Sequence, residues 1–258
     1  MNILTIGDIV GENGLKKLVD EIEKLRKEYE VDFLIVNGEN SAGGMGISTK
    51  NFDTLVNTVK ADVVTMGNHT WAKKDIFGFI NDEKLIVPAN YSDKVPGKGY
   101  NIYKVNGKNV CVIELMGRTD MNVLTDNPFN KAERILDKIR GKADIIFVEM
   151  HAEATAEKLA MAYYLDGKVQ AVYGTHTHIQ TADERILTNG TAYISDIGMT
   201  GPKNSVIGMD VEASVKRFST TLPERYKLAT GECFLNGCLF KIDDNTNKVV
   251  EIKRIRVD

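Results

Sequence analysis

The sequence predicts an α/β fold in which two mixed β-sheets carry helices on their outer faces. Before Tyr100, short apolar runs alternate with stretches whose apolar residues recur at helical spacing, and after it the pattern becomes richer in strands. Two sheets with helices on the outside would bury both faces of each sheet. No linker-like or low-complexity stretch separates the two halves, so we expect one domain over residues 1–258.

Four strands and two helices are expected before Tyr100. The strands are the apolar runs 3–6, 33–36, 63–66 and 85–87. The first helix carries apolar residues at helical spacing, namely Leu15, Leu18, Val19, Ile22 and Leu25. A second helix, capped by Thr49, would carry Phe52, Leu55, Val56 and Val59 on one face.

After Tyr100 the sequence predicts a hairpin, one helix and several further strands. The hairpin pairs 100–105 with 110–115 around Asn106-Gly107, a dipeptide that favours tight turns. Asn130 and Glu133 suit the start of the helix. One face of that helix would present Ala132, Ile135, Leu136 and Ile139. The remaining strands are expected at 145–148, 171–173, 192–195, 233–242 and 249–257.

Composition and charge narrow the kinds of partner. Hydrophobic residues make up 43% of the chain, enough for a sizeable core, and the formal net charge is −3. Without a basic tail, the chain is not suited to hold nucleic acid through phosphate contacts, although a small anionic substrate is compatible with it. The N-terminus lacks signal-peptide features, and no apolar run reaches the roughly 20 residues of a membrane span. A cytoplasmic protein is therefore expected.

The three cysteines, Cys111, Cys233 and Cys238, do not form the pattern of a disulfide framework. Their odd number and wide spacing point to a reducing compartment. Asn236-Gly237, between the last two, is a hairpin-turn signal. Because zinc needs a fuller ligand set than this pair supplies, we interpret both cysteines as ordinary hairpin residues.

Each predicted strand of the α/β pattern ends in a polar residue. These residues are Asp8, Glu39, Asn40, Asn68, His69, His151, His176 and His178. The carboxyl ends of strands are where α/β sheets bind ligands, and neighbouring strands lie only ~5 Å apart, so the side chains can converge. Nitrogen and oxygen ligands without sulfur suit Mn, Fe or Zn. The sequence thus predicts a metal site at this edge.

The number and positions of the histidines are the main support for this metal site. The chain has only 4, and each follows an apolar run beside other potential ligands. A single such histidine is as well explained by a hydrogen bond in the core, but the combination favours metal binding. His176 and His178, at positions i and i+2 of a segment expected to be extended, would point to one side, where each of two adjacent metals could take one.

Taken together, these residues resemble the calcineurin-like metallophosphoesterase superfamily. Its pattern places an Asp after the first strand, a bridging carboxylate after the second, Gly-Asn-His after the third, then a lone His and a Gly-His-x-His. The corresponding residues here are Asp8, Glu39, Asn68, His69, His151, His176 and His178. The motifs extend from residue 7 to residue 178.

Three departures from that pattern point to one branch. The first motif is Asp8-Ile9-Val10 and lacks the usual histidine; Glu39 replaces an aspartate and is followed by Asn40; and Thr70 replaces an acidic residue. Together with Asp196-Ile197-Gly198-Met199-Thr200-Gly201-Pro202, this altered set resembles the YmdB-like branch.

The resemblance implies a four-layer αββα sandwich, a di-iron centre and hydrolysis of 2′,3′-cyclic nucleotides. Metal one would take Asp8, Glu39, Asn40 and His178, and metal two would take Glu39, Asn68, His151 and His176. Glu39 would bridge the two ions. A hydroxide shared by ions ~3.5–4 Å apart would attack the phosphorus, and His69 would act as general acid. Iron is the expected metal, with Mn or Zn still open.

Several points remain open at the level of sequence. Arg118 and Lys203 could contact phosphate, although surface charge is the simpler interpretation. Trp71 could stack on a base or pack in the core. The expected partner is a small phosphoester, in particular a nucleotide, and homo-oligomerisation is undecided. The competing functions are a broader phosphomonoesterase or phosphodiesterase, and a metal-containing regulatory protein of RNA metabolism or signalling that depends little on turnover.

Overall fold

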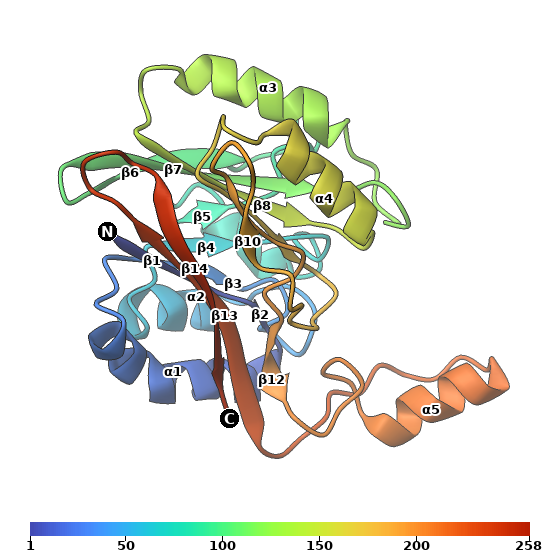
Figure 1. The fold of residues 1–258 in the computed structure, drawn as a ribbon. Helices are drawn as coiled ribbons and strands as arrows, with labels where there is room; N and C mark the ends of the chain where they lie inside the picture. The colour runs from blue at the N-terminus through green and yellow to red at the C-terminus, as the bar shows by residue number, and fades with distance from the viewer.

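Two mixed β-sheets face each other in the computed structural model, which describes residues 1–258, and helices cover their outer faces (Figure 1). The first sheet has eight strands in the order β2-β12-β13-β1-β3-β4-β5, with β14 paired to β13. Its strands are β1 (Asn2–Ile6), β2 (Asp8–Ile9), β3 (Phe33–Asn37), β4 (Val63–Thr65), β5 (Leu85–Ile86), β12 (Met199–Pro202), β13 (Cys233–Ile242) and β14 (Val249–Val257).

The second sheet has six strands in the order β10-β11-β9-β8-β7-β6. Its strands are β6 (Tyr100–Val105), β7 (Lys108–Met116), β8 (Ile145–His151), β9 (Ala171–Thr175), β10 (Arg185–Ile186) and β11 (Ala192–Ile194). The helices are α1 (Gly11–Glu28), α2 (Thr49–Asp53), α3 (Pro128–Ile139), α4 (Thr155–Tyr164) and α5 (Val211–Thr220), with a π-helical turn at Thr54–Thr58 and a 3-10 turn at Lys74–Gly78. None of the helices is long and apolar enough to cross a membrane.

The alternation of side chains along the strands creates the layers. In β1, Ile3 belongs to the cluster between the two sheets, whereas Leu4 packs toward α1 with residues such as Leu18. In the middle layer, the Phe147 ring meets the Phe240 ring edge-on at 5.1 Å. A third cluster lies between the second sheet and helices α3 and α4 (Figure 1). Because both faces of each sheet are buried, the predicted two-sheet α/β fold is confirmed.

Parallel pairing sets the direction of the strands that matter for function. β1, β3 and β4 run parallel in the first sheet, and β7, β8 and β9 run parallel in the second. Parallel strands end at the same edge, so the polar residues that follow them are gathered on one side of each sheet. The strand pairing therefore places the predicted metal-site residues within reach of one another.

The tight turn predicted at Asn106-Gly107 is confirmed, but the one at Asn236-Gly237 is wrong. Asn106 and Gly107 have φ values of 48° and 82°, as a hairpin turn requires. Gly237 instead lies in the middle of β13, opposite Ile6 of β1. A Cβ at this glycine would lie 2.3 Å from the Thr5 carbonyl oxygen, so close approach of two strands, not a turn, requires glycine here.

Two predicted helix caps are displaced by one to several residues. Ser48, not Thr49, caps α2 by accepting a hydrogen bond from the Asn51 amide at 3.2 Å. Asn127, not Asn130 or Glu133, caps α3, and Pro128 follows it as the first helical residue. Helices α4 and α5 are additions to the elements predicted from the sequence. Helix α5 projects away from the two sheets (Figure 1), and none of its residues is buried.

Candidate metal centre

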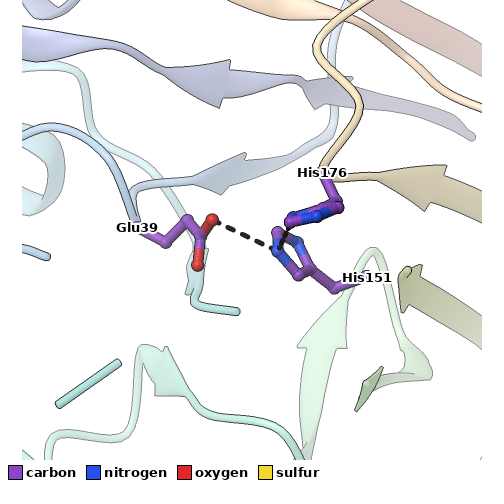
Figure 2. Close-up of side chains that lie close together, drawn as sticks. All are labelled: Glu39, His151 and His176. Carbon is purple, nitrogen blue, oxygen red and sulfur yellow. Dashed lines mark hydrogen bonds and ion pairs between the residues drawn. The ribbon is translucent and has the colours of Figure 1, made fainter. Parts of the chain in front are cut away.

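The structure brings all eight predicted site residues to the same end of the two sheets. Asp8 lies in β2, while His151 is the last residue of β8. The loops that follow β3, β4 and β9 carry the others, namely Glu39, Asn40, Asn68, His69, His176 and His178. The potential ligand atoms of Glu39, His151 and His176 all lie within 4.8 Å of one another (Figure 2).

The His151 ring is the centre of one group of potential ligands. Its Nε2 atom lies 2.8 Å from Asn68 Oδ1, 3.2 Å from Glu39 Oε1 and 3.1 Å from His176 Nδ1. These four side chains form the set proposed from the resemblance for one metal. Three nitrogen and oxygen atoms gathered around the His151 nitrogen are compatible with a cation that would be held by these four side chains.

A second group forms around His178. Its Nε2 atom lies 3.1 Å from Asn40 Nδ2 and 3.8 Å from Asp8 Oδ1. Glu39 touches this group too, because its Oε1 accepts a hydrogen bond from Asn40 at 3.3 Å. Asp8 Oδ1 and Asn40 Oδ1 are buried oxygens without a hydrogen-bond partner. Since unpaired buried acceptors are costly, these two oxygens fit a site that is completed by a cation.

Gly67 leaves the space that this arrangement needs. A Cβ at this position would lie 2.4 Å from both Glu39 Oε2 and His151 Nε2. No real side chain fits at such distances, so the glycine before Asn68 allows Glu39 and His151 to approach each other. The Gly67-Asn68-His69 motif thus has a steric reason for its first residue.

The segment with His176 and His178 is not extended, so that prediction is wrong. Both histidines have positive φ values, 94° and 66°, and the His176 ring contacts His151 whereas the His178 ring contacts Asn40. Thr177 between them donates hydrogen bonds from its amide at 3.0 Å and its hydroxyl at 2.6 Å to Asp196 Oδ2. The same oxygen accepts a bond from the Lys158 ammonium at 2.9 Å. A buried ion pair therefore holds the turn that separates the histidines.

Burial and mutual charge shift the pKa values of the buried groups. Burial raises the pKa of Asp8 to about 6, although His178 and His151 oppose the rise. Burial alone would raise the pKa of Glu39, but His151 and the His69 amide hold it at about 2. For His151, burial is outweighed by Glu39 and Asp8, which raise its pKa to about 9. Two buried carboxylates thus give the site negative potential, which suits a cation.

Two histidines on the cavity wall, His69 and His176, have lowered pKa values. Burial, followed by repulsion from His151, lowers the pKa of His176 to about 3. Burial also lowers the pKa of His69, whose amide donates to Glu39 Oε2 at 3.0 Å. Both rings line an open cavity of about 320 Å³ together with Glu39. The cavity gives a small molecule access to the cluster.

The structure adds residues that sequence reasoning missed as parts of the site. Thr175 Oγ1 lies 2.9 Å from His151 Nδ1 and donates to Glu149 Oε1 at 2.9 Å, so this pair orients the His151 ring. Glu149 also accepts bonds from Asn37, Thr65 and Tyr173. A carboxylate in an apolar strand was the available signal. The Ile207 carbonyl lies 2.9 Å from His178 Nδ1, and no feature of the sequence indicates this contact.

Three further candidates lie off the cavity wall. Arg118 is exposed and does not line the cavity. The Lys203 ammonium pairs with Glu232 at 2.9 Å. Trp71 packs against the rings of Phe77 and Tyr91 at centroid distances of 5.7 and 5.6 Å. These contacts explain the positions of the Lys203 and Trp71 side chains without a bound substrate.

A two-sheet α/β fold that gathers carboxylate, amide and imidazole groups at the carboxyl ends of its strands is the metallophosphoesterase fold. The chain belongs to the YmdB-like family, whose model matches residues 4–255. It is 49% identical over 259 residues to a Bacillus subtilis (strain 168) protein named 2′,3′-cyclic-nucleotide 2′-phosphodiesterase, with 100% of this chain and 97% of that protein covered.

Two solved structures are similar over the whole chain. A hypothetical protein from Thermus thermophilus has 37% sequence identity and a TM-score of 0.93, with 100% of this chain and 99% of that one covered. A Mycoplasma pneumoniae protein described as a novel phosphatase has 34% identity and a TM-score of 0.94, with 100% and 93% covered. Both likenesses agree with the fold described above.

Proposed function

We propose that this phosphoric ester hydrolase is a phosphodiesterase that opens 2′,3′-cyclic nucleotides at a two-metal centre. The observation that carries the proposal is the position of Glu39, which contacts His151 in one ligand group and Asn40 in the other. A carboxylate has two oxygens, so it can serve two cations at once. The cyclic-nucleotide specificity is supported by the Bacillus subtilis relative.

The two groups of side chains are the proposed ligand sets. Asp8, Asn40 and His178 would hold one ion, and Asn68, His151 and His176 would hold the other, with Glu39 shared. When bound, the two ions would activate water and neutralise charge on the phosphoryl oxygens. Nitrogen and oxygen donors admit iron, which we propose, and also Mn or Zn. Asn40 takes the place of the histidine that the first motif lacks.

His69 is the proposed proton donor. The His69 ring lines the same cavity as the proposed ligands. Its neighbour Asn68 is the proposed ligand of the pair, because Asn68 Oδ1 contacts His151. A proton delivered to the leaving ribose oxygen would prevent the release of an unstable alkoxide. The lowered pKa of His69 makes its protonated form a stronger acid toward that oxygen. Residues 1–258 would perform the reaction as one domain.

The broader alternative is a phosphatase and phosphodiesterase without preference for cyclic nucleotides, which the phosphatase description of the Mycoplasma pneumoniae structure favours. A substrate panel separates the two. We expect kcat/KM to be highest for 2′,3′-cyclic nucleotides, ahead of 3′,5′-cyclic nucleotides, nucleoside monophosphates and p-nitrophenyl phosphoesters. Equal or higher kcat/KM for the p-nitrophenyl esters would support the broader activity.

A further inference from the structure

An arm of residues 205–228, which contains α5, reaches from the first sheet to the cavity beside the metal-site residues. Most of the arm projects away from the body of the protein (Figure 1). Its root, however, contributes Ile207, Met209 and Tyr226 to the wall of the same 320 Å³ cavity that His69 lines. Met45, from the glycine-rich loop after β3, lines that cavity as well.

These four side chains give the cavity a second wall of different chemistry. One wall carries the carboxylate and imidazole groups, whereas this wall is apolar and partly open to solvent. Tyr226 is 66% exposed, Ile207 44% and Met45 37%. Large apolar side chains exposed together beside a polar cavity are typical of a ligand-binding wall.

The root of the arm is fixed relative to the metal-site residues. The Ile207 carbonyl lies 2.9 Å from His178 Nδ1, and the Asp210 amide donates to the Lys227 carbonyl at 2.9 Å, one residue from Tyr226. Leu228 packs so closely on the glycine loop that a Cβ at Gly44 would lie 2.6 Å from it. Tyr226 and Met45 therefore belong to one connected unit with His178.

We propose that Tyr226, Met209, Ile207 and Met45 form a subsite for the base of the nucleotide, with the Tyr226 ring as its stacking surface. This inference rests on the proposed function. A nucleotide has an anionic ester at one end and a flat aromatic base at the other, which matches the two walls of the cavity. The Arg217 guanidinium carbon lies 5.5 Å from the centroid of the Tyr226 ring and would hold the ring in place.

Stacking depends on the face of the base and not on its hydrogen-bonding edge, so the subsite accepts every base. Purines offer a larger face than pyrimidines. We therefore expect KM to be lower for purine than for pyrimidine 2′,3′-cyclic nucleotides, without strong discrimination within each class.

The test compares substrates with and without a base. Wild type and the variants Tyr226→Ala and Tyr226→Phe are assayed with 2′,3′-cyclic AMP and with methyl riboside 2,3-cyclic phosphate, which lacks the base. Tyr163→Ala is the matched control, because Tyr163 is 58% exposed on α4 and does not line the cavity. We expect Tyr226→Ala to abolish an advantage in KM of about 5- to 100-fold that the base confers, and Tyr226→Phe and Tyr163→Ala to retain it.

A binding measurement provides a second readout that does not depend on turnover. 2-Aminopurine riboside 3′-monophosphate loses fluorescence when its base stacks, so wild type should quench it and Tyr226→Ala should not. If Tyr226→Ala lost affinity equally for the substrates with and without a base, the subsite would be overturned. Unchanged kinetics in this variant would overturn it as well, and an altered sedimentation coefficient would then assign Tyr226 to a contact between copies of the chain. Failure of wild type to turn over any 2′,3′-cyclic nucleotide would instead overturn the proposed function, and the subsite with it.

Discussion

The Lys158 ammonium lies 2.9 Å from the Asp196 carboxylate, and each side chain is only 1% exposed. The same carboxylate oxygen accepts both hydrogen bonds from Thr177. Because Thr177 separates His176 from His178, this ion pair determines the backbone turn on which both candidate ligands depend. Lys158 on α4 thus supports the candidate metal centre without lining its cavity.

Removal of Lys158 should therefore be costly. Lys158→Ala leaves the buried Asp196 carboxylate without its partner, and we expect the free energy of unfolding to fall by about 3–5 kcal/mol in urea titrations. Lys16→Ala is the control, because its pair with Asp20 is exposed (75% and 52%) and screened by water, so its loss should change the free energy of unfolding very little. Similar losses in both variants would mean that the buried pair does not hold the turn.

Gly67→Ala should abolish metal binding while the fold persists. The added methyl group would lie 2.4 Å from Glu39 Oε2 and His151 Nε2, so these ligands must separate. Metal content after purification and far-UV circular dichroism measure the two effects. Gly78→Ala is the matched control, since a Cβ there meets nothing within 4 Å. Retention of metal by Gly67→Ala would contradict the described packing of the ligands.

Asp8→Asn should stabilise the metal-free protein while it weakens metal binding. The Asp8 pKa is about 6 in the folded protein, against 3.8 ordinarily, because of burial. The folded chain therefore binds more protons than the unfolded chain between these pH values, and the contribution of Asp8 to stability falls as the pH rises from 3.8 to about 6. At pH 7 the variant should be more stable by on the order of 1–3 kcal/mol.

The stability of Asp8→Asn and wild type at acid pH provides the control for this prediction. Below the unfolded-state pKa, Asp8 is protonated in both states, so the variant and wild type should have equal stability at the lowest pH that preserves the fold. Urea titrations in the presence of a chelator, with the exposed Asp53→Asn as control, measure this. A stability gain that is independent of pH would show that burial of the charge is not its cause.

His69→Ala should lose turnover and keep its metals. A general acid contributes roughly 10²–10⁴-fold to the rate, so kcat should fall within that range while the metal content stays at the wild-type level. Steady-state kinetics with 2′,3′-cyclic AMP and elemental analysis of the same samples give both numbers. Loss of metal from this variant would make His69 a ligand.

The sequence could predict the strands and the residues that follow them, because both depend on local pattern. Apolar runs such as 145–148 mark buried strands, and parallel strands bring their ends together. The turn at His176 and His178 could not be predicted, since its cause lies in Lys158 and Asp196, which are distant in the chain. At Asn236-Gly237 the local turn signal was overridden by contact with β1.

The cavity wall formed by the arm shows a similar limit. Val211, Val215 and Phe218 recur at helical spacing along α5, but none of its residues is buried, so the pattern does not indicate what the helix packs against. Tyr226 reaches the cavity because the hydrogen bond from the Asp210 amide to the Lys227 carbonyl brings the end of the arm back to its root. Contacts between residues far apart in sequence, and not local propensity, determine this part of the site.

The number of metal ions bound per chain tests the central claim most directly. The two ligand groups that share Glu39 predict two ions per chain in wild type, measured by elemental analysis after reconstitution with iron, Mn or Zn. Asp8→Asn should retain the ion at His151 and lose the one at His178. Binding of a single ion by wild type, or of none with any of these metals, would contradict a two-metal centre.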